Sequence, residues 1–191
     1  VKNTLKTTLP TLGKELVISF LFYPTSYTYK GWTSILHLTT RGDTGKYGDR
    51  TPGIFFNPSQ GLQVSSSVNG QHDYRKKFNP SPAPIGQWTK IVISQLKQEN
   101  KYIFKIDIGD NTFSVENTQP AEFTNVHVFA SDPWYVAQPG SIKELNIQSN
   151  ICSLGLETCY SSASELKLVK NTLQTKLPAM GKEWLISFLF N

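Results

Sequence analysis

Clusters of Gly, Pro, Asn and Asp divide this sequence into short apolar runs, and no stretch longer than ten residues has a sustained helical period. The runs are rich in β-branched and aromatic residues, which favour strands. They cover residues 15–23, 32–40, 53–57, 62–68, 88–96, 101–109, 112–117, 125–131 and 141–148. Nine short strands at regular spacing predict an all-β fold, an antiparallel β-sandwich.

The clearest strand pair covers residues 101–117. Residues Phe104, Ile106 and Ile108 alternate with polar residues and fall on one face of the first strand. Residues 109–111, Gly-Asp-Asn, supply a turn before the second strand. The pattern predicts a β-hairpin whose apolar face lies in the core.

The sequence begins a second time at residue 169. Residues 169–191 repeat residues 1–23 with 16 identities in 23 positions, which chance does not supply. A period of 168 residues is far longer than that of solenoid repeats, so each repeat is expected to be a whole domain of a longer chain. We predict a β-sandwich repeat over 1–150, a Cys-containing linker over 151–168, and the start of the next repeat over 169–191.

The second copy contains a segment that is apolar on both faces. Its apolar residues include Trp184, Leu185, Ile186, Phe188 and Phe190. Such a strand is not stable when exposed. It either begins the next domain, folds back on the first, or pairs with a neighbouring chain, and the last arrangement would build a fibre.

The composition limits the partners of the chain. The sequence has no run of about 18 apolar residues, so no membrane span is expected. Its net charge is +5, but the basic residues do not form the long clusters of a nucleic-acid binder. This mildly basic balance favours acidic partners such as anionic glycans.

The two cysteines lie in the predicted linker, and no pair of histidines lies near them. Zinc binding is therefore not expected. In an extracellular chain, we expect Cys152 and Cys159 to form a disulfide that stiffens the joint between repeats.

Catalytic patterns are missing from the sequence. The three histidines, His37, His72 and His127, are isolated from one another, and His37 and His127 are interpreted as ordinary strand residues. No paired acids of the kind that glycosidases use, and no nucleophile elbow, are present. We expect a protein that is not an enzyme.

Carboxylates in Gly-rich turns indicate a calcium site. Asp43 and Asp49 lie six apart in RGDTGKYGDRTP, and Asp132 lies in SDPWY. Calcium takes six to eight oxygen ligands, which such loops supply. Alternatively, these side chains cap turns through their own backbone, or Asp49 forms an ion pair with Arg50.

Several aromatic residues lie next to turn residues. Trp134, Tyr135, Tyr47 and Tyr74 are candidates for stacking on sugar rings, whereas Trp88 is placed in the core because of its position in a strand. The basic run YRKKF over residues 74–78 is either a contact for acidic polysaccharide or a solvated loop.

Residues 86–117, GQWTKIVISQLKQENKYIFKIDIGDNTFSVEN, resemble a strand pair of laminin-G and concanavalin-A-like jelly rolls. Residues 31–56 and 128–145 also resemble a laminin-G-like repeat of large extracellular proteins of marine invertebrates. The resemblance covers residues 1–150. It implies a jelly-roll β-sandwich, an extracellular location, and a structural or binding module that often holds calcium and sometimes a glycan.

We therefore expect a structural or adhesive repeat module of an extracellular protein. Its partners would be further copies of the repeat, assembled into fibres by strand pairing. The alternative is a lectin-like module that binds extracellular glycans with the assistance of calcium.

Overall fold

The computed structural model describes residues 2–27, 30–59 and 61–149. These residues form twelve strands and no helix, which confirms the predicted all-β fold. The strands are β1 (Leu5–Leu12), β2 (Leu16–Pro24), β3 (Thr33–Thr39), β4 (Gly53–Phe56), β5 (Leu62–Val68), β6 (Gln71–Phe78), β7 (Thr89–Gln98), β8 (Lys101–Ile108), β9 (Asn111–Asn117), β10 (Phe123–Phe129), β11 (Val136–Ala137) and β12 (Gly140–Ser149).

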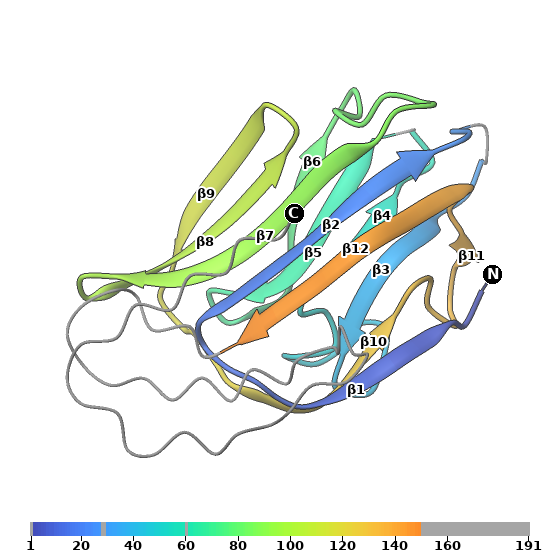
Figure 1. Ribbon diagram of the computed structural model, residues 1–191. Coiled ribbons are helices and arrows are strands. Elements are labelled where there is room, and N and C mark those ends of the chain that lie inside the picture. The colour runs from blue at the N-terminus through green and yellow to red at the C-terminus, as the bar shows by residue number, and fades with distance from the viewer. Residues whose placement is uncertain (1, 28–29, 60, 150–191) are drawn as a thin grey trace, which may run out of the picture.

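The strands form two sheets that pack face to face as a β-sandwich (Figure 1). Sheet A has the order β1-β10-β3-β4-β5-β6, with the short β11 beside β3. Sheet B has the order β12-β2-β7-β8-β9 and lies in front of sheet A in Figure 1. All pairs are antiparallel except β11 with β3. Successive strands often belong to different sheets, as in a jelly roll.

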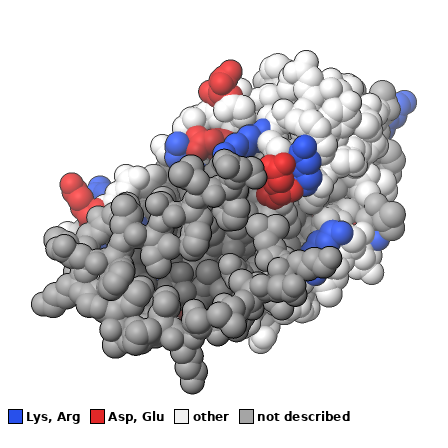
Figure 2. All heavy atoms as spheres, in the orientation of Figure 1, with Lys and Arg blue, Asp and Glu red and all other residues white. Residues whose placement is uncertain are grey.

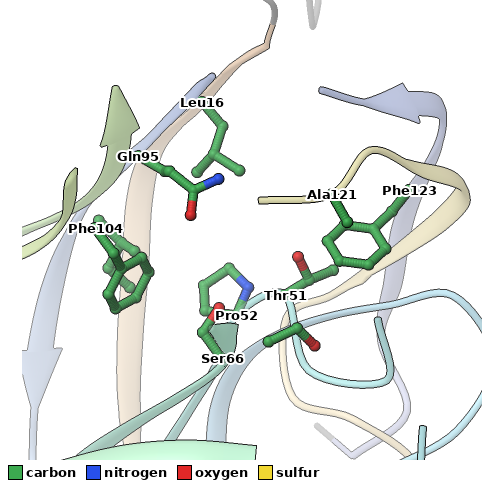
Figure 3. A pocket seen from close by; sticks show the side chains of 10 residues that line it. Leu16, Thr51, Pro52, Ser66, Gln95, Phe104, Ala121 and Phe123 are labelled. Carbon is green, nitrogen blue, oxygen red and sulfur yellow. The ribbon is translucent and has the colours of Figure 1, made fainter. Parts of the chain in front are cut away.

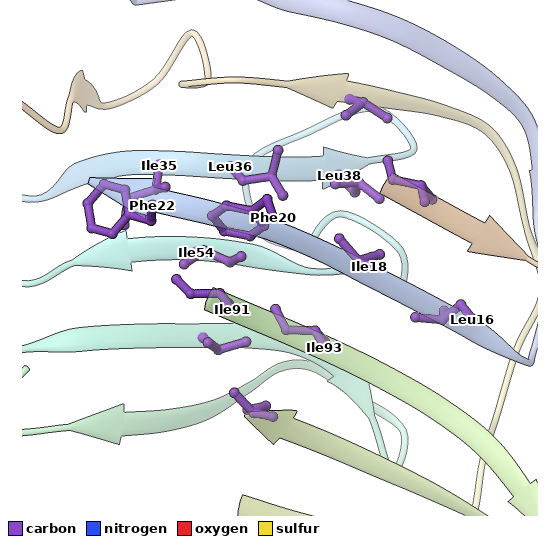
Figure 4. Packing of buried hydrophobic residues seen from close by; sticks show 14 of the residues in the cluster. Leu16, Ile18, Phe20, Phe22, Ile35, Leu36, Leu38, Ile54, Ile91 and Ile93 are labelled. Carbon is purple, nitrogen blue, oxygen red and sulfur yellow. The ribbon is translucent and has the colours of Figure 1, made fainter. Parts of the chain in front are cut away.

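The core lies between the two sheets. In β2, burial alternates strictly, so that Ile18, Phe20 and Phe22 face sheet A while the residues between them face outward. Leu36, Leu38 and Ile54 of sheet A meet this face (Figure 4). The predicted hairpin is confirmed, because β8 and β9 pair with Ile108 opposite Asn111.

The outer face of sheet A is also covered at its centre. Every residue of β3, β4 and β5 is buried, including those that point away from sheet B. The segments that follow β3 and β10 fold over this face and contact its side chains. This second, smaller packed layer positions the residues described below.

Sequence analysis missed β1, β6 and β11. The alternative that YRKKF is a solvated loop is wrong, because these residues lie in β6, the edge strand beside β5. Tyr74 and Phe78 point inward against the core, and Lys76, at the inward position between them, masks the alternation. The core assignment of Trp88 is also wrong: it is 43% exposed, one position before the inward-facing Thr89.

Candidate functional site

A buried histidine lies at the centre of the covered face of sheet A. His37 is on β3 between Leu36 and Leu38, which belong to the core, so its ring points the other way. Its Nδ1 lies 2.9 Å from Oδ2 of Asp132, and its Nε2 lies 2.8 Å from the carbonyl oxygen of Asp49. The ring therefore joins the segment after β3 to the segment after β10.

Asp132 organises the turn that carries two aromatic residues. Its Oδ1 accepts hydrogen bonds from the backbone N–H groups of Trp134, at 3.0 Å, and Tyr135, at 2.8 Å. Burial opposes ionisation, but the hydrogen bonds from His37 and from the Tyr135 backbone outweigh it and hold the pKa of Asp132 below its usual value. Asp132 thus caps a turn, as the alternative to calcium ligation predicts.

Arg50 is the centre of a charged cluster on the same face. Its Nη2 donates to Oδ1 of Asp43 at 2.9 Å, and its Nη1 donates to Oδ1 of Asp73 at 2.8 Å. The guanidinium also lies 4.8 Å from the ring centroid of Phe55. Burial lowers the pKa of Arg50, but the two carboxylates outweigh this effect and raise it. Arg50 therefore pairs with Asp43 and Asp73, and the suggested pair with Asp49 is wrong.

Tyr135 connects this cluster to an aromatic surface. Its hydroxyl donates to Oδ2 of Asp43 at 2.7 Å and accepts from Nη2 of Arg50 at 3.3 Å. Burial and the neighbouring Asp43 raise the pKa of Tyr135 to about 12. Its ring lies 5.4 Å from that of Phe55 and 6.4 Å from that of Trp32. These ring contacts and the hydrogen bonds of the hydroxyl together restrict the orientation of Tyr135.

Arg75 extends the cluster to the solvent. It lies on β6 two residues after Asp73, and its Nε donates to Oδ2 of Asp73 at 2.7 Å. Burial opposes ionisation of Asp73, but hydrogen bonds from Arg75 and Arg50 outweigh it and lower its pKa. We name Asp43, Arg50, Asp73, Arg75 and Tyr135 the Arg50 cluster. It offers fixed hydrogen-bond donors and acceptors next to aromatic rings.

Trp134 is the most exposed aromatic residue beside the cluster. It is 39% exposed, and its ring contacts those of His37, at 5.4 Å, and Phe129, at 6.3 Å. The structure therefore brings together four of the residues that sequence analysis singled out: Asp43, Asp132, Trp134 and Tyr135.

Tyr47 and Tyr74 do not join this group. The Tyr47 hydroxyl donates to the carbonyl oxygen of Gln119 at 2.7 Å, and its ring packs on Phe123. Tyr74 packs against the hydrophobic core from the inner face of β6. Neither ring shares a surface with Trp134.

Asp49 lies within the loop between β3 and β4. Its Oδ2 accepts the N–H of Lys46 at 2.8 Å, while its Oδ1 is buried without a hydrogen bond, 3.7 Å from Nε of Arg41. Among the described residues, no group of three or more His, Cys, Asp or Glu side chains is placed to hold a metal ion. Calcium binding by Asp43, Asp49 and Asp132 stays a prediction.

The other predicted site residues cannot be placed. Cys152 and Cys159, and the apolar segment with Trp184, Leu185, Ile186, Phe188 and Phe190, lie outside the described residues.

Two hollows lie away from the Arg50 cluster. One is a cavity of about 10 Å³ between the sheets, near Leu16, Phe104 and Phe123 (Figure 3), and it is no larger than one water needs. The other is a groove of about 270 Å³ between the β1 and β12 sides of the sandwich, with Phe22 and Ile35 in its lining. Neither hollow is lined by a member of the Arg50 cluster.

The sequence did not indicate a role for Asp73, and it indicated other roles for His37, as an ordinary strand residue, and for Arg50, as the partner of Asp49. Arg75 was noted only as part of the basic run YRKKF. A histidine in the middle of the apolar run ILHLT was one available signal, because a buried imidazole requires polar partners. Nothing local in the sequence indicates that Asp73 meets Arg50, since 23 positions separate them.

No protein-family model and no curated protein matches the sequence. Solved structures are similar in fold. The CBM40 module of the Ruminococcus gnavus IT-sialidase, solved with α2,3-sialyllactose, has a TM-score of 0.51 and 15% identity over 80% of this chain and 91% of its own. Sheep galectin-11 has a TM-score of 0.43 and 13% identity, covering 77% and 98%. CG-16, an agglutinin from chicken liver, has a TM-score of 0.44 and 13% identity, covering 75% and 96%.

At 15% identity, the similarity to the CBM40 module shows a shared fold. The part of the chain that the structure describes contains no helix that could span a membrane. The two packed sheets and the similarity to the CBM40 module together identify the fold as a jelly-roll β-sandwich, in agreement with the predicted fold class.

Proposed function

We propose that this β-sandwich is a lectin-like module, not an enzyme, that binds extracellular glycans at the surface formed by Trp134, Tyr135 and the Arg50 cluster. The observation that carries the proposal is the environment of Tyr135. Its ring is held by Phe55 and its hydroxyl by Asp43 and Arg50, beside exposed aromatic and charged groups.

Sugar rings have apolar C–H faces and polar hydroxyl edges, so they need an aromatic surface next to fixed donors and acceptors. Trp134 offers the exposed ring, and Arg75 and Tyr135 offer polar groups that other side chains already hold in place. A surface that is ordered before binding loses little conformational entropy when the ligand arrives. This favours glycan binding over a purely structural role for the surface.

The comparison supports the proposal at the level of the fold. The CBM40 module was solved with α2,3-sialyllactose, so this type of sandwich is used for glycan recognition. The residues that would bind a glycan here are argued from this chain alone.

A glycan array tests the proposal. The full chain is expected to bind a subset of glycans, and Trp134→Ala is expected to abolish binding. Trp88→Ala is the matched control, because Trp88 is similarly exposed but packs on Tyr23 of sheet B. Absence of binding to every glycan contradicts the proposal, as does equal loss in both variants. Repeating the array in calcium and in EDTA tests the predicted assistance by calcium.

A structural or adhesive role stays a second candidate because of the restart of the sequence at residue 169. The core positions Ile18, Phe20 and Phe22 are identical in the copy as Ile186, Phe188 and Phe190. If the copy pairs between chains, the full chain forms dimers or filaments that Phe188→Lys abolishes. Sedimentation velocity at increasing concentration measures this, and a monomer throughout contradicts self-assembly.

A further inference from the structure

We propose that the glycan recognised by this surface is acidic, and that Arg75 and Lys77 on the outer face of β6 bind its carboxylate or sulfate groups. This inference rests on the proposed function and names the class of its ligand. The inference depends on which charged side chains of the Arg50 cluster are exposed to solvent.

The negative charges of the cluster are buried and the positive charge at its margin is exposed. The side chains of Asp43 and Asp73 are only 19% and 8% exposed, and Arg50, which neutralises them, is 6% exposed. Arg75, by contrast, is 54% exposed. A ligand that approaches this surface therefore meets cations first.

Arg75 is oriented by its partner. Its Nε and Nη2 both donate to Oδ2 of Asp73, which occupies one edge of the planar guanidinium. No hydrogen bond from its Nη1 to a described residue is found. A guanidinium that is fixed along one edge presents the remaining N–H groups in a defined direction, which suits the geometry of carboxylate and sulfate oxygens.

Lys77 adds a second cation on the same face. It follows Arg75 by two positions in β6, so both side chains point away from sheet B, about 7 Å apart along the strand. Lys77 is exposed and makes no ion pair with a described residue. The residues opposite the two cations on β5, Gln63 and Ser65, are neutral. No carboxylate of β5 therefore neutralises this pair.

The face seen in Figure 2 differs from this arrangement. There, described acidic and basic side chains lie next to one another and form no large surface of a single charge. Lys143 lies 3.9 Å from Glu144, and Lys105 lies 3.0 Å from Asp107. On the outer face of β6, by contrast, the exposed Arg75 and Lys77 have no carboxylate opposite them on β5.

The test measures binding of the full chain to dextran sulfate, polygalacturonate and neutral dextran by biolayer interferometry. Dextran sulfate carries sulfate groups, polygalacturonate carries carboxylate groups, and dextran is uncharged. Comparing the three therefore shows which group the protein binds. The double variant Arg75→Gln/Lys77→Gln is compared with Lys97→Gln/Lys101→Gln, which removes the same charge from the far end of sheet B. Arg75→Lys keeps the charge but loses the planar fork.

We expect at least one acidic polymer to bind about tenfold more tightly than dextran, and the Arg75/Lys77 variant to lose about tenfold in affinity. The Lys97/Lys101 variant should keep its affinity within threefold, and Arg75→Lys should recover part of the loss. Which acidic polymer binds identifies sulfate or carboxylate as the ligand group.

Equal loss in the two double variants overturns the inference, because it indicates binding through net charge alone. Dextran binding as tight as that of the acidic polymers also overturns it. If the array instead shows neutral glycans whose binding requires Trp134 but not Arg75, the proposed function stands and the inference fails. If no glycan binds, both fail.

Discussion

His37 and Asp132 lie 95 positions apart in the sequence and form a fully buried pair, with 2.9 Å between Nδ1 and Oδ2. The other ring nitrogen of His37 lies against the carbonyl oxygen of Asp49, the residue before Arg50. The other carboxylate oxygen of Asp132 holds the turn with Trp134 and Tyr135. One contact therefore fixes both segments that build the candidate site.

Asp132→Asn should lower the free energy of unfolding by about 2 kcal/mol, because an amide nitrogen replaces one of the two buried carboxylate oxygens, which contact the His37 ring and accept from the Trp134 and Tyr135 backbone. Urea denaturation measures the change. Glu122→Gln, at an exposed position outside the site, should stay within about 0.5 kcal/mol. A loss below about 1 kcal/mol in Asp132→Asn would show that the pair does not hold the two segments together.

Stability should fall in acid. The folded-state pKa values of Asp73 and Asp132 lie below 3.8, the ordinary pKa of an aspartate in the unfolded chain. Each ionised carboxylate therefore stabilises the fold at pH values above this unfolded-state pKa. This stabilisation is complete near neutral pH and is lost as the pH falls below 3.8 through the folded-state values. Urea denaturation between pH 7 and pH 2 measures the slope. Asp73→Asn should flatten it, and an unchanged slope contradicts the assignment.

Arg50→Ala should destabilise the protein by about 3 kcal/mol or more, because Asp43 and Asp73 would be left buried without their shared cation. Arg50→Lys should recover little, since one ammonium group cannot reproduce the two-sided guanidinium contact. The surface pair Lys101 and Glu116 serves as the comparison, and Lys101→Ala should cost at most about 1 kcal/mol. Thermal and urea denaturation compare the variants, and full recovery in Arg50→Lys contradicts this account.

Gly53→Ala should disturb the site through packing. A Cβ atom at Gly53 would lie 2.5 Å from Cε2 of Phe55, whose ring contacts His37, Tyr135 and the Arg50 guanidinium. Overpacking of this kind costs about 1–3 kcal/mol. Denaturation should show this loss, and glycan binding should weaken as Tyr135 shifts. If the protein loses stability but glycan binding is unchanged, Phe55 does not position the binding surface.

The sequence predicted the sandwich well because its signals are local. Alternation in β2 and β8 and the turn at Gly109 each depend on neighbouring residues. The strand β6 escaped detection because Lys76 lies at an inward position between Tyr74 and Phe78 and interrupts the apolar alternation.

The candidate site was only partly predictable for a different reason. The turn residues Asp132, Trp134 and Tyr135 stand together in the sequence, so they were found as candidates. The contacts that make them a site join Asp132 to His37 and Arg50 to Asp73. Such pairings depend on the order of strands in sheet A, which local patterns do not encode.

The most direct test of the account is an NMR titration of the full chain with a glycan that binds on the array. We expect the indole N–H signal of Trp134 and the Nε–H signal of Arg75 to shift with the same dissociation constant, while the indole signal of Trp88 stays in place. Shifts at Trp88 without shifts at Trp134 would place the binding surface on sheet B and contradict the central claim.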